Sequence, residues 1–582
     1  MNKARHGPLD KYWLENLMNN DFDAIVVGSG ISGGWAIKEL TERGLKVLLI
    51  ERGPETIHGE DYIGEGKAPW ELPYHGAIPE DTLSKEYAIQ KQCYALDDAT
   101  KHFFVNDRQH PYITDKDKPF SWIRGYQLGG RSLLWYRQSY RWSEMDFTAN
   151  KLDGHGVDWP IRYQDIAPWY DHVETFAGIS GSKEGLEQLP DGQFLPPMEM
   201  NCVELEVKKQ IERQFPNRSM IIGRCAHLTK PTKEHLELGR GQCQSRDECE
   251  RGCSFGAYFS TLSATLPAAK RTKNLTILTD SIVHSVVYDS ANKRATGVRI
   301  INSKTNEYEE LNARLIFLCA STLGTTQIML NSRSNTFPNG IANSSGCLGL
   351  NLMDHIFESG ASGEYPGFKD KYFKGRRPNG IYIPRYHNVN TRDERFLRGF
   401  GFQGGGKRPS WERAKSIPGI GVSLKEQLRK PGSWTFSLGG FGEMLPDQRN
   451  RVWLDKKLKD KWGIPILNIE CILRENERKM LKVMSEDAKE MLEASGIINV
   501  QPYNNSAPPG LAIHEMGTAR MGHDPNTSVL NKYNQAHDVP NLFVTDGSCM
   551  ASSACQNPSL TYMALTARAS ANAVEMLQEG KL

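Results

Sequence analysis

The sequence predicts an α/β protein with a Rossmann-like domain and a second domain built on antiparallel sheet. The first observation is a strand, a glycine turn, a helix and a second strand in succession at residues 21–53. The second is a continuous apolar run at residues 313–320, typical of a strand buried on both faces of a parallel sheet. The third is residues 357–509, where glycines, aromatic residues and alternating polarity indicate antiparallel strands.

The composition excludes several classes of protein. The chain has 582 residues, enough for two or more domains with buried cores. Lys and Arg number 71 against 69 Asp and Glu, so the net charge of +2 favours neither nucleic acid nor an anionic membrane as partner. No apolar run reaches the length of about 20 residues that a membrane span needs, and residues 1–20 lack the apolar core of a secretory signal. The 11 cysteines are unevenly spaced, which does not indicate a disulfide framework.

The first element of the chain has the order of a dinucleotide-binding unit. An apolar strand at residues 22–27 runs into a glycine turn at residues 28–33, and a helix follows to about residue 43. A second apolar strand at residues 47–50 then ends at an acidic residue, Glu51. Because strand, turn, helix, strand and acid are all present, we interpret this unit as the site of a dinucleotide rather than a purely structural turn. The pattern does not choose between NAD and FAD.

Each residue of this unit has a physical role. Gly28 permits the tight turn, Gly30 lets the backbone approach a pyrophosphate, and Gly33 lets the helix pack closely on the strand. The helix N-terminus offers free N–H groups to the phosphates. Glu51 can accept hydrogen bonds from a ribose diol. The neighbouring residues assigned to the same cofactor site are Ile31, Ser32 and Arg52.

Two later stretches are expected to reach the same site. The paired glycines Gly129 and Gly130, with Ser132, suggest backbone pressed against a flat ligand or another strand. Residues 274–298 alternate as strands of a β-meander, and Val283 within them is assigned to the cofactor site. After the apolar strand at 313–320, Ser321 begins a helix, so its turn should lie at the same sheet edge as the glycine turn.

A cysteine-rich stretch stands apart from the rest of the chain. Cys243, Cys249 and Cys253 lie within eleven residues, and thiolates this close can hold one iron–sulfur cluster. Three ligands suit a three-iron cluster, and Cys225 could complete four. A structural zinc site is an alternative, although its usual CxxC pairs are absent. A cysteine-rich loop without metal is the third alternative, and the spacing alone leaves all three open.

The C-terminal stretch holds side chains suited to an alcohol. An imidazole such as His514 can take a hydroxyl proton near neutral pH, while an amide such as Asn557 holds the same oxygen. On the residues alone His514 can equally be structural, and His355, next to Asp354, is interpreted as a structural histidine. A third parallel strand at residues 542–544 leads into a turn that can meet ribityl or phosphate oxygens. The cofactor residues assigned here are Asp546, Gly547, Asn557, Pro558 and Thr561.

In this combination the chain resembles the glucose–methanol–choline (GMC) family of FAD-dependent oxidoreductases over almost its whole length. The segment Ser321–Ser332 matches the family's second signature only in part. The motifs that carry the resemblance are Gly28–Gly33 with Glu51, Leu128–Gly130, Gly349–His355, His514–Gly522, Asp546-Gly547 and Asn557-Pro558.

The resemblance implies a fold and a cofactor. The expected fold is an FAD-binding Rossmann-like domain with a discontinuous antiparallel-sheet substrate domain, the GMC fold. The implied boundaries are 1–150, 200–356 and 510–582 for the FAD domain and 151–199 and 357–509 for the substrate domain. The cofactor is expected to be FAD, and non-covalent, because the loop Arg131–Tyr140 lacks the histidine to which some relatives attach flavin.

The resemblance also implies a reaction. His514 falls at the position of the catalytic base, and Asn557 at the position that holds the substrate oxygen. The chain is most similar to bacterial FAD sugar dehydrogenases, including glucoside 3-dehydrogenases and the catalytic subunit of FAD glucose dehydrogenase. That similarity implies a 3Fe-4S cluster on the ligands Cys243, Cys249 and Cys253, a small accessory subunit and a cytochrome-type acceptor.

We therefore expect oxidation of a sugar or glycoside hydroxyl, with the electrons passing through the cluster to an external acceptor. The alternatives are a sugar or polyol oxidase that uses oxygen, a gluconate or polyol dehydrogenase, and, least favoured, a flavin-binding subunit without turnover. The expected location is the periplasm, after export with a signal-bearing partner subunit, or else the cytoplasm. The sequence does not identify the sugar or the carbon that is oxidised.

Overall fold

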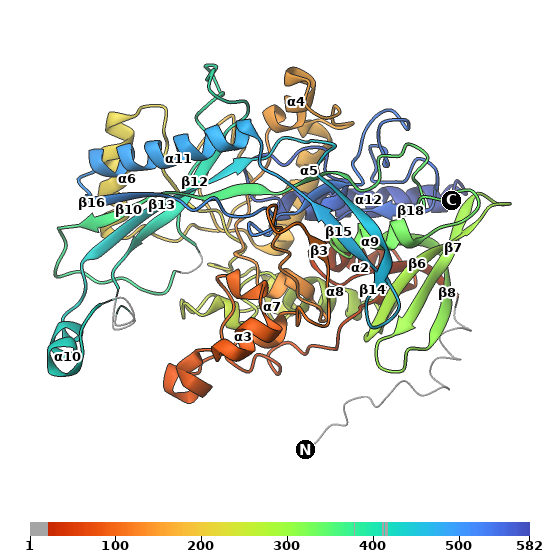
Figure 1. Ribbon diagram of the computed structural model, residues 1–582, viewed down its shortest axis with the longest axis horizontal. Coiled ribbons are helices and arrows are strands. Elements are labelled where there is room, and N and C mark those ends of the chain that lie inside the picture. Colours follow the sequence, from red (N-terminus) through yellow and green to blue (C-terminus); the bar gives the residue numbers. More distant parts are fainter. Residues whose placement is uncertain (1–20, 377–378, 410–412, 414–416) are drawn as a thin grey trace.

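The computed structural model describes residues 21–376, 379–409, 413 and 417–582 (Figure 1). Residues 1–20, on which the expectation about a secretory signal depends, lie outside this part of the chain. The described residues form a mixed seven-stranded sheet, a six-stranded antiparallel sheet and a five-stranded sheet. In the described ranges, no helix has both the length and the apolar character needed to cross a membrane. The predicted α/β fold is confirmed.

Parallel strands form the centre of the first sheet. The strands β1 (Phe22–Val27) and β2 (Val47–Ile50) pair in parallel, and β1 also pairs with β8 (Tyr308–Leu318). The outer neighbours are β5 (Leu275–Leu278) beside β2 and β18 (Leu542–Val544) beside β8. Because the carboxyl ends of parallel strands share one edge, the turns after β1, β2, β8 and β18 meet there.

Two helices cover one face of this sheet. Helix α2 (Ile31–Glu42) follows the glycine turn, and the C-terminal helix α12 (Ser559–Gln578) packs beside it in one apolar cluster. On the other side of β8, the strands β6 (Ser281–Asp289) and β7 (Arg294–Asn302) form an antiparallel meander. Helix α9 (Thr322–Asn331) leaves β8 as the predicted second strand–turn–helix.

The second sheet is antiparallel, as predicted for residues 357–509. Helix α11 (Glu475–Ala494) lies across it (Figure 1) and packs so closely that a Cβ added to Gly440 would lie 2.7 Å from the Met484 sulfur. The strands, in spatial order, are β16 (Ile498–Asn504), β10 (His355–Tyr365), β13 (Trp434–Glu443), β12 (Phe400–Lys407), β11 (Ile381–Ile383) and β4 (Ile221–Ile222).

The third sheet brings two distant histidines together. Strand β9 (Leu350–Met353) ends just before Asp354 and His355, and strand β17 (Met516–Thr518) begins just after His514. The two strands pair antiparallel, with Met516 opposite Met353. The remaining strands of this sheet are β14 (Arg451–Lys459), β15 (Pro465–Glu470) and β3 (Ile113–Thr114).

The other α-helices connect these sheets. They are α3 (Glu80–Glu86), α4 (Glu144–Asp153), α5 (Tyr163–Ala177), α6 (Cys202–Gln214), α7 (Lys233–Glu237), α8 (Leu266–Arg271) and α10 (Gly421–Arg429). The predicted domain boundaries stay a prediction.

Candidate active site

A cavity of about 540 Å³ lies at the edge where the parallel strands end. One part of its wall comes from the turns after these strands, including Gly28, Glu51 and Asp546. Another part comes from the antiparallel sheet, through Gln403 and Phe441. The cavity therefore joins the nucleotide-binding unit to the domain predicted to bind substrate.

The glycine turn leaves room for a ligand on one side only. Gly28 has φ +92°, and a Cβ there would lie 2.6 Å from the Cys319 carbonyl oxygen. A Cβ on Gly33 would lie 1.8 Å from the Gly28 carbonyl oxygen, so helix and strand touch at this point. A Cβ on Gly30 would meet nothing within 4 Å, and Gly30 lines the cavity. The N-terminus of α2 has no side-chain cap, so its N–H groups are free to bind phosphate.

Glu51 is buried at the end of β2, where a ribose would lie. Its carboxylate accepts hydrogen bonds from the Ser29 backbone N–H at 3.1 Å, the Ser29 hydroxyl at 2.5 Å and the Gly53 N–H at 3.0 Å. Burial raises the pKa of Glu51, and these hydrogen bonds oppose that rise. The Ser29 hydroxyl also accepts the Gly129 N–H at 2.9 Å, so one serine joins Glu51 to the second glycine segment.

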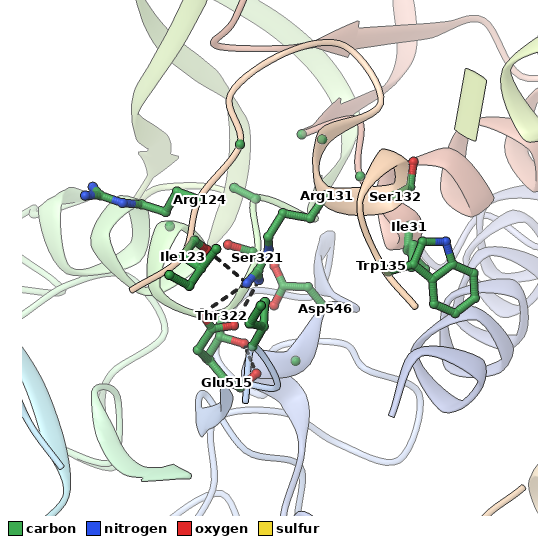
Figure 2. A pocket seen from close by; sticks show the side chains of 18 of the residues that line it. Ile31, Ile123, Arg124, Arg131, Ser132, Trp135, Ser321, Thr322, Glu515 and Asp546 are labelled. Carbon is green, nitrogen blue, oxygen red and sulfur yellow. Dashed lines mark hydrogen bonds and ion pairs between the residues drawn. The ribbon is translucent and has the colours of Figure 1, made fainter. Parts of the chain in front are cut away.

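An ion pair that the sequence did not reveal connects the glycine segment to the C-terminal stretch. Figure 2 shows the Arg131 guanidinium directed at Glu515, and both residues line the cavity. The bonds are bidentate, with Nη1 to Oε1 at 3.1 Å and Nη2 to Oε2 at 2.9 Å, and Arg131 also donates to the Ile123 carbonyl at 3.2 Å. Because Glu515 follows His514 directly, the pair fixes the position of the histidine relative to the cofactor loop.

His514 and Asn557 meet at the cavity. The Asn557 amide nitrogen lies 3.4 Å from His514 Nε2, and the Gln403 amide donates to Asn557 Oδ1 at 2.6 Å. The Phe441 ring lies beside the imidazole, with centroids 6.3 Å apart. Burial, together with the neighbouring His355 and Arg131, holds the pKa of His514 well below its ordinary value. The imidazole is therefore neutral at physiological pH and able to accept a proton.

The loop that carries His514 is held by Asp354. The Asp354 carboxylate accepts backbone N–H groups from Gly510 at 2.7 Å, Ala512 at 3.2 Å and His514 at 3.0 Å. Burial, with the nearby Glu515, raises the pKa of Asp354 to about 7. His355 is also buried, and its Nδ1 lies 2.9 Å from His514 Nδ1. The sequence placed Asp354 beside His355 but did not show that either contacts the base.

The structure brings most of the predicted cofactor residues to this cavity. Ser132 reaches the wall and also holds its own loop, donating to the Gly129 carbonyl at 2.6 Å. The Asp546 carboxylate is used within the protein, by Ser548 and Thr325. The other predicted residues that line the cavity are Gly28, Gly30, Ile31, Ser32, Glu51, Arg52, Gly130, Val283, Gly547 and Asn557.

Four predicted cofactor residues do not line the cavity: Gly33, Gly129, Pro558 and Thr561. The Thr561 hydroxyl hydrogen-bonds the Tyr170 hydroxyl at 2.7 Å, on the face of α12 that packs against α5. Gly33 and Gly129 act through the backbone instead, by close packing and by the bond to Ser29. The Pro558 residue lies just before the start of α12.

The metal site predicted for the cysteine loop is not supported by the structure. Within the described residues, no group of three or more His, Cys, Asp or Glu side chains is placed to hold a metal ion. The Cys249 sulfur lies 4.0 Å from His227 Nε2 and the Cys253 sulfur 3.9 Å from an Arg246 nitrogen. Burial raises the pKa of the Cys243 and Cys249 thiols, and the neighbouring cysteine thiols contribute to that rise. The geometry does not support a 3Fe-4S cluster on Cys243, Cys249 and Cys253, and Cys225 is buried and hydrogen-bonded elsewhere.

Comparison with protein families decides what this arrangement is. Two family profiles described as GMC oxidoreductase match the chain, one over residues 22–357 and the other over residues 446–566. The chain belongs to the GMC oxidoreductase family. Both histidine positions and the glycine turn lie within the matched ranges, so the resemblance expected from the motifs is confirmed.

Relatives of this GMC oxidoreductase match along nearly the whole chain. A 2-methyl-1,2-propanediol dehydrogenase of Mycolicibacterium austroafricanum is 28% identical, over 94% of this chain and 94% of the relative. The fructose dehydrogenase large subunit of Gluconobacter japonicus is 25% identical, over 96% and 98%. Among solved structures, the pyridoxine 4-oxidase described from Mesorbium loti shares the fold, with a TM-score of 0.57 at 17% identity, covering 95% of this chain and 99% of that one.

The GMC family binds FAD and acts on CH–OH groups, and the cavity of this oxidoreductase fits that cofactor. The uncapped helix N-terminus and the open side of Gly30 would receive the pyrophosphate, and Glu51 stands at the ribose end. His514 and Asn557, the residues predicted to be catalytic, line the same cavity. The chain is an FAD-dependent oxidoreductase acting on CH–OH groups.

Proposed function

We propose that this enzyme is a dehydrogenase that oxidises a hydroxyl of a sugar or glycoside, with the 3-hydroxyl of a glycoside as the reacting group. The observation that carries the proposal is the pair of His514 and Asn557 at a cavity shared by the nucleotide unit and the antiparallel sheet. The fructose dehydrogenase relative supports a sugar as the substrate class.

The chain's own residues supply position and proton transfer. Bound FAD would supply the acceptor for the hydride from the carbinol carbon. A hydroxyl placed between His514 Nε2 and the Asn557 amide donates its proton to the imidazole, while its oxygen accepts a hydrogen bond from the amide. Gln403 holds Asn557 in the orientation that this requires.

The wall around this pair suits a sugar ring. Phe357 and Phe441 are stacked, with centroids 5.7 Å apart at 29°, and both line the cavity. Such rings pack against the C–H face of a pyranose, while the amide of Gln403 can bind its hydroxyls. The same wall would give a small alcohol fewer contacts.

We propose that the flavin is held non-covalently and that electrons leave to a cytochrome-type acceptor, with a small accessory subunit beside the enzyme. The fructose dehydrogenase relative is a large subunit, which supports the presence of a partner subunit. Export to the periplasm with such a partner, or retention in the cytoplasm, belongs to the same proposal. No electron step is assigned to the cysteine loop. Iron and acid-labile sulfide analysis of the purified protein tests whether the loop holds a cluster, because about three irons per chain would show that the 3Fe-4S cluster is present.

Protonation of His514 is not expected to lower the rate of flavin reduction between about pH 6 and 8, where the group that titrates beside it is Asp354, with a pKa of about 7. The lowered pKa of His514 keeps the base form present until the pH falls through that lowered value, and only then is the rate lost. Stopped-flow reduction with saturating sugar, from about pH 4 to 9, measures this. An acid limb with an apparent pKa at or above the ordinary value of about 6.5 that remains in Asp354→Asn, which removes the other titrating group, would contradict the assignment.

Anaerobic mixing of the holoenzyme with a panel of sugars and glycosides tests the proposed substrate class. We expect a glycoside to bleach the flavin absorbance faster than 2-methyl-1,2-propanediol does, because the aromatic wall contacts a ring. Reoxidation is then followed with oxygen and with a one-electron dye. Faster reoxidation by oxygen would establish the oxidase alternative, and bleaching by no member of the panel would contradict the proposal.

A further inference from the structure

Hydrogen bonds at both ring nitrogens of His355 define its protonation pattern. Its Nε2 lies 3.0 Å from the Ser553 carbonyl oxygen, and its Nδ1 lies 2.9 Å from His514 Nδ1. A carbonyl oxygen can only accept, so His355 Nε2 must carry the hydrogen. Burial lowers the pKa of His355 to about 4, so the ring is neutral and its Nδ1 is an acceptor.

This pattern determines the tautomer of the neighbouring ring. Since His355 Nδ1 accepts, His514 Nδ1 must donate, and the hydrogen of neutral His514 is therefore on Nδ1. His514 Nε2 is left with a free lone pair, and it is the nitrogen that faces Asn557 at 3.4 Å. In the other tautomer His514 Nε2 would carry a hydrogen and could not take a proton from a substrate.

The opposite end of the chain of hydrogen bonds agrees with this assignment. Gln403 donates to Asn557 Oδ1, which directs the Asn557 NH₂ group toward His514 Nε2 as a donor. Every hydrogen from Gln403 to Ser553 thus points in the same direction, and no donor faces a donor. The charged groups near these rings are Arg131, Asp354 and Glu515, and none of them hydrogen-bonds an imidazole nitrogen of either histidine.

The carbonyl at the end of the chain is itself fixed. The Ser553 hydroxyl accepts the Met444 N–H at 3.1 Å and donates to the Met444 carbonyl at 3.0 Å. The two histidines are fixed by the pairing of β9 with β17. Neither end of the contact can therefore turn away without breaking secondary structure or a buried bond.

We propose that His355 is a positioning residue. Because His355 donates to the Ser553 carbonyl, it holds His514 in the tautomer whose Nε2 is unprotonated. This rests on the proposed use of His514 as base. The tautomer itself exists without turnover, so the two proposals can fail separately.

The first test uses the wild-type holoenzyme labelled with ¹⁵N-histidine, with the His514 signals identified by their loss in His514→Ala. We expect the Nε2 signal of His514 at the position of an unprotonated imidazole nitrogen and the Nδ1 signal at that of a protonated one. A protonated Nε2 would overturn the proposal, whatever the enzyme's substrate.

The second test compares His355→Phe, which cannot accept, with His355→Asn, whose Oδ1 can. We expect His355→Phe to lower the rate of flavin reduction about 100-fold with little change in the substrate concentration that gives half the maximal rate, and to move His514 toward the other tautomer. His355→Asn is expected to restore at least part of the rate. The matched control is His235→Phe, since His235 is another buried histidine bonded to a backbone carbonyl, that of Phe176 at 3.1 Å, away from the cavity.

Normal flavin reduction in folded His355→Phe would overturn the proposal, as would an unchanged His514 tautomer in that variant. If His355→Phe does not fold, the ¹⁵N spectrum of the wild-type enzyme and the rate of flavin reduction in His355→Asn still test the proposal. Equal loss of rate in His355→Phe and His235→Phe would show only a loss of packing and would also overturn it.

Discussion

Replacing His514 with alanine is expected to lower the rate of flavin reduction by at least about 100-fold while FAD stays bound. The His514 imidazole lies at the cavity, is neutral and half-buried, and is hydrogen-bonded so that it can accept a hydroxyl proton. Its removal does not touch the glycine turn or Glu51, so the cofactor site should remain intact. Stopped-flow reduction under anaerobic conditions measures the rate, and the flavin spectrum of the purified variant measures occupancy.

His537→Ala is the matched control, because His537 is a half-buried histidine outside the cavity that bonds Ser528 at 3.0 Å. It should reduce its flavin at the wild-type rate. Unchanged single-turnover reduction in His514→Ala would remove His514 from the mechanism. Loss of FAD from His514→Ala would instead show that His514 helps to hold the cofactor.

Gly30→Ala is expected to weaken FAD binding by at least about 100-fold, or about 2.7 kcal/mol, without unfolding the protein. The added Cβ meets no protein atom within 4 Å, so the apoprotein should fold normally. It enters the cavity where the backbone would approach the pyrophosphate. Fluorescence titration of the apoprotein with FAD measures the affinity, and circular dichroism checks the fold.

Variants of two other glycines serve as controls for this prediction. In Gly33→Ala the new Cβ would lie 1.8 Å from the Gly28 carbonyl oxygen, so we expect this variant to lose its native fold. In Gly241→Ala the Cβ would lie 3.5 Å from the Phe255 carbonyl oxygen, an ordinary contact, and FAD binding should be normal. Wild-type affinity in Gly30→Ala would show that the pyrophosphate does not approach this residue.

Local patterns were enough to predict the elements around the cofactor. The strands at 22–27, 47–50 and 542–544 have the predicted bounds, because their apolar runs and the glycine turn depend only on neighbouring residues. The open side of Gly30 and the closed side of Gly33 likewise follow from the motif.

The contacts that organise the base could not be predicted in this way. Arg131 and Glu515 are 384 residues apart, and only the folded chain brings them together as a partly buried pair. The contact of His355 with His514 depends on the register of β9 against β17, which no local pattern specifies. The signal available in the sequence was the presence of acids directly beside both histidines, at Asp354 and Glu515.

The cysteine loop shows how far spacing alone can reach. Close spacing along the chain predicts a shared cluster, and in the structure the sulfurs of Cys249 and Cys253 also lie near His227 and Arg246. Spacing limits how far apart the residues can be, whereas the directions of the side chains depend on the surrounding fold.

The most direct test of the central claim is the effect of deuterium on flavin reduction. The holoenzyme is mixed without oxygen with a sugar or glycoside from the panel, carrying either hydrogen or deuterium on the carbon of the reacting hydroxyl. We predict that the flavin is bleached and that deuterium slows the bleaching well beyond experimental error. The reason is that the bond from the carbinol carbon to its hydrogen breaks in the step that reduces the flavin, while His514 takes the hydroxyl proton. Bleaching at the same rate with both substrates at every hydroxyl carbon, or no bleaching at all, would contradict the account.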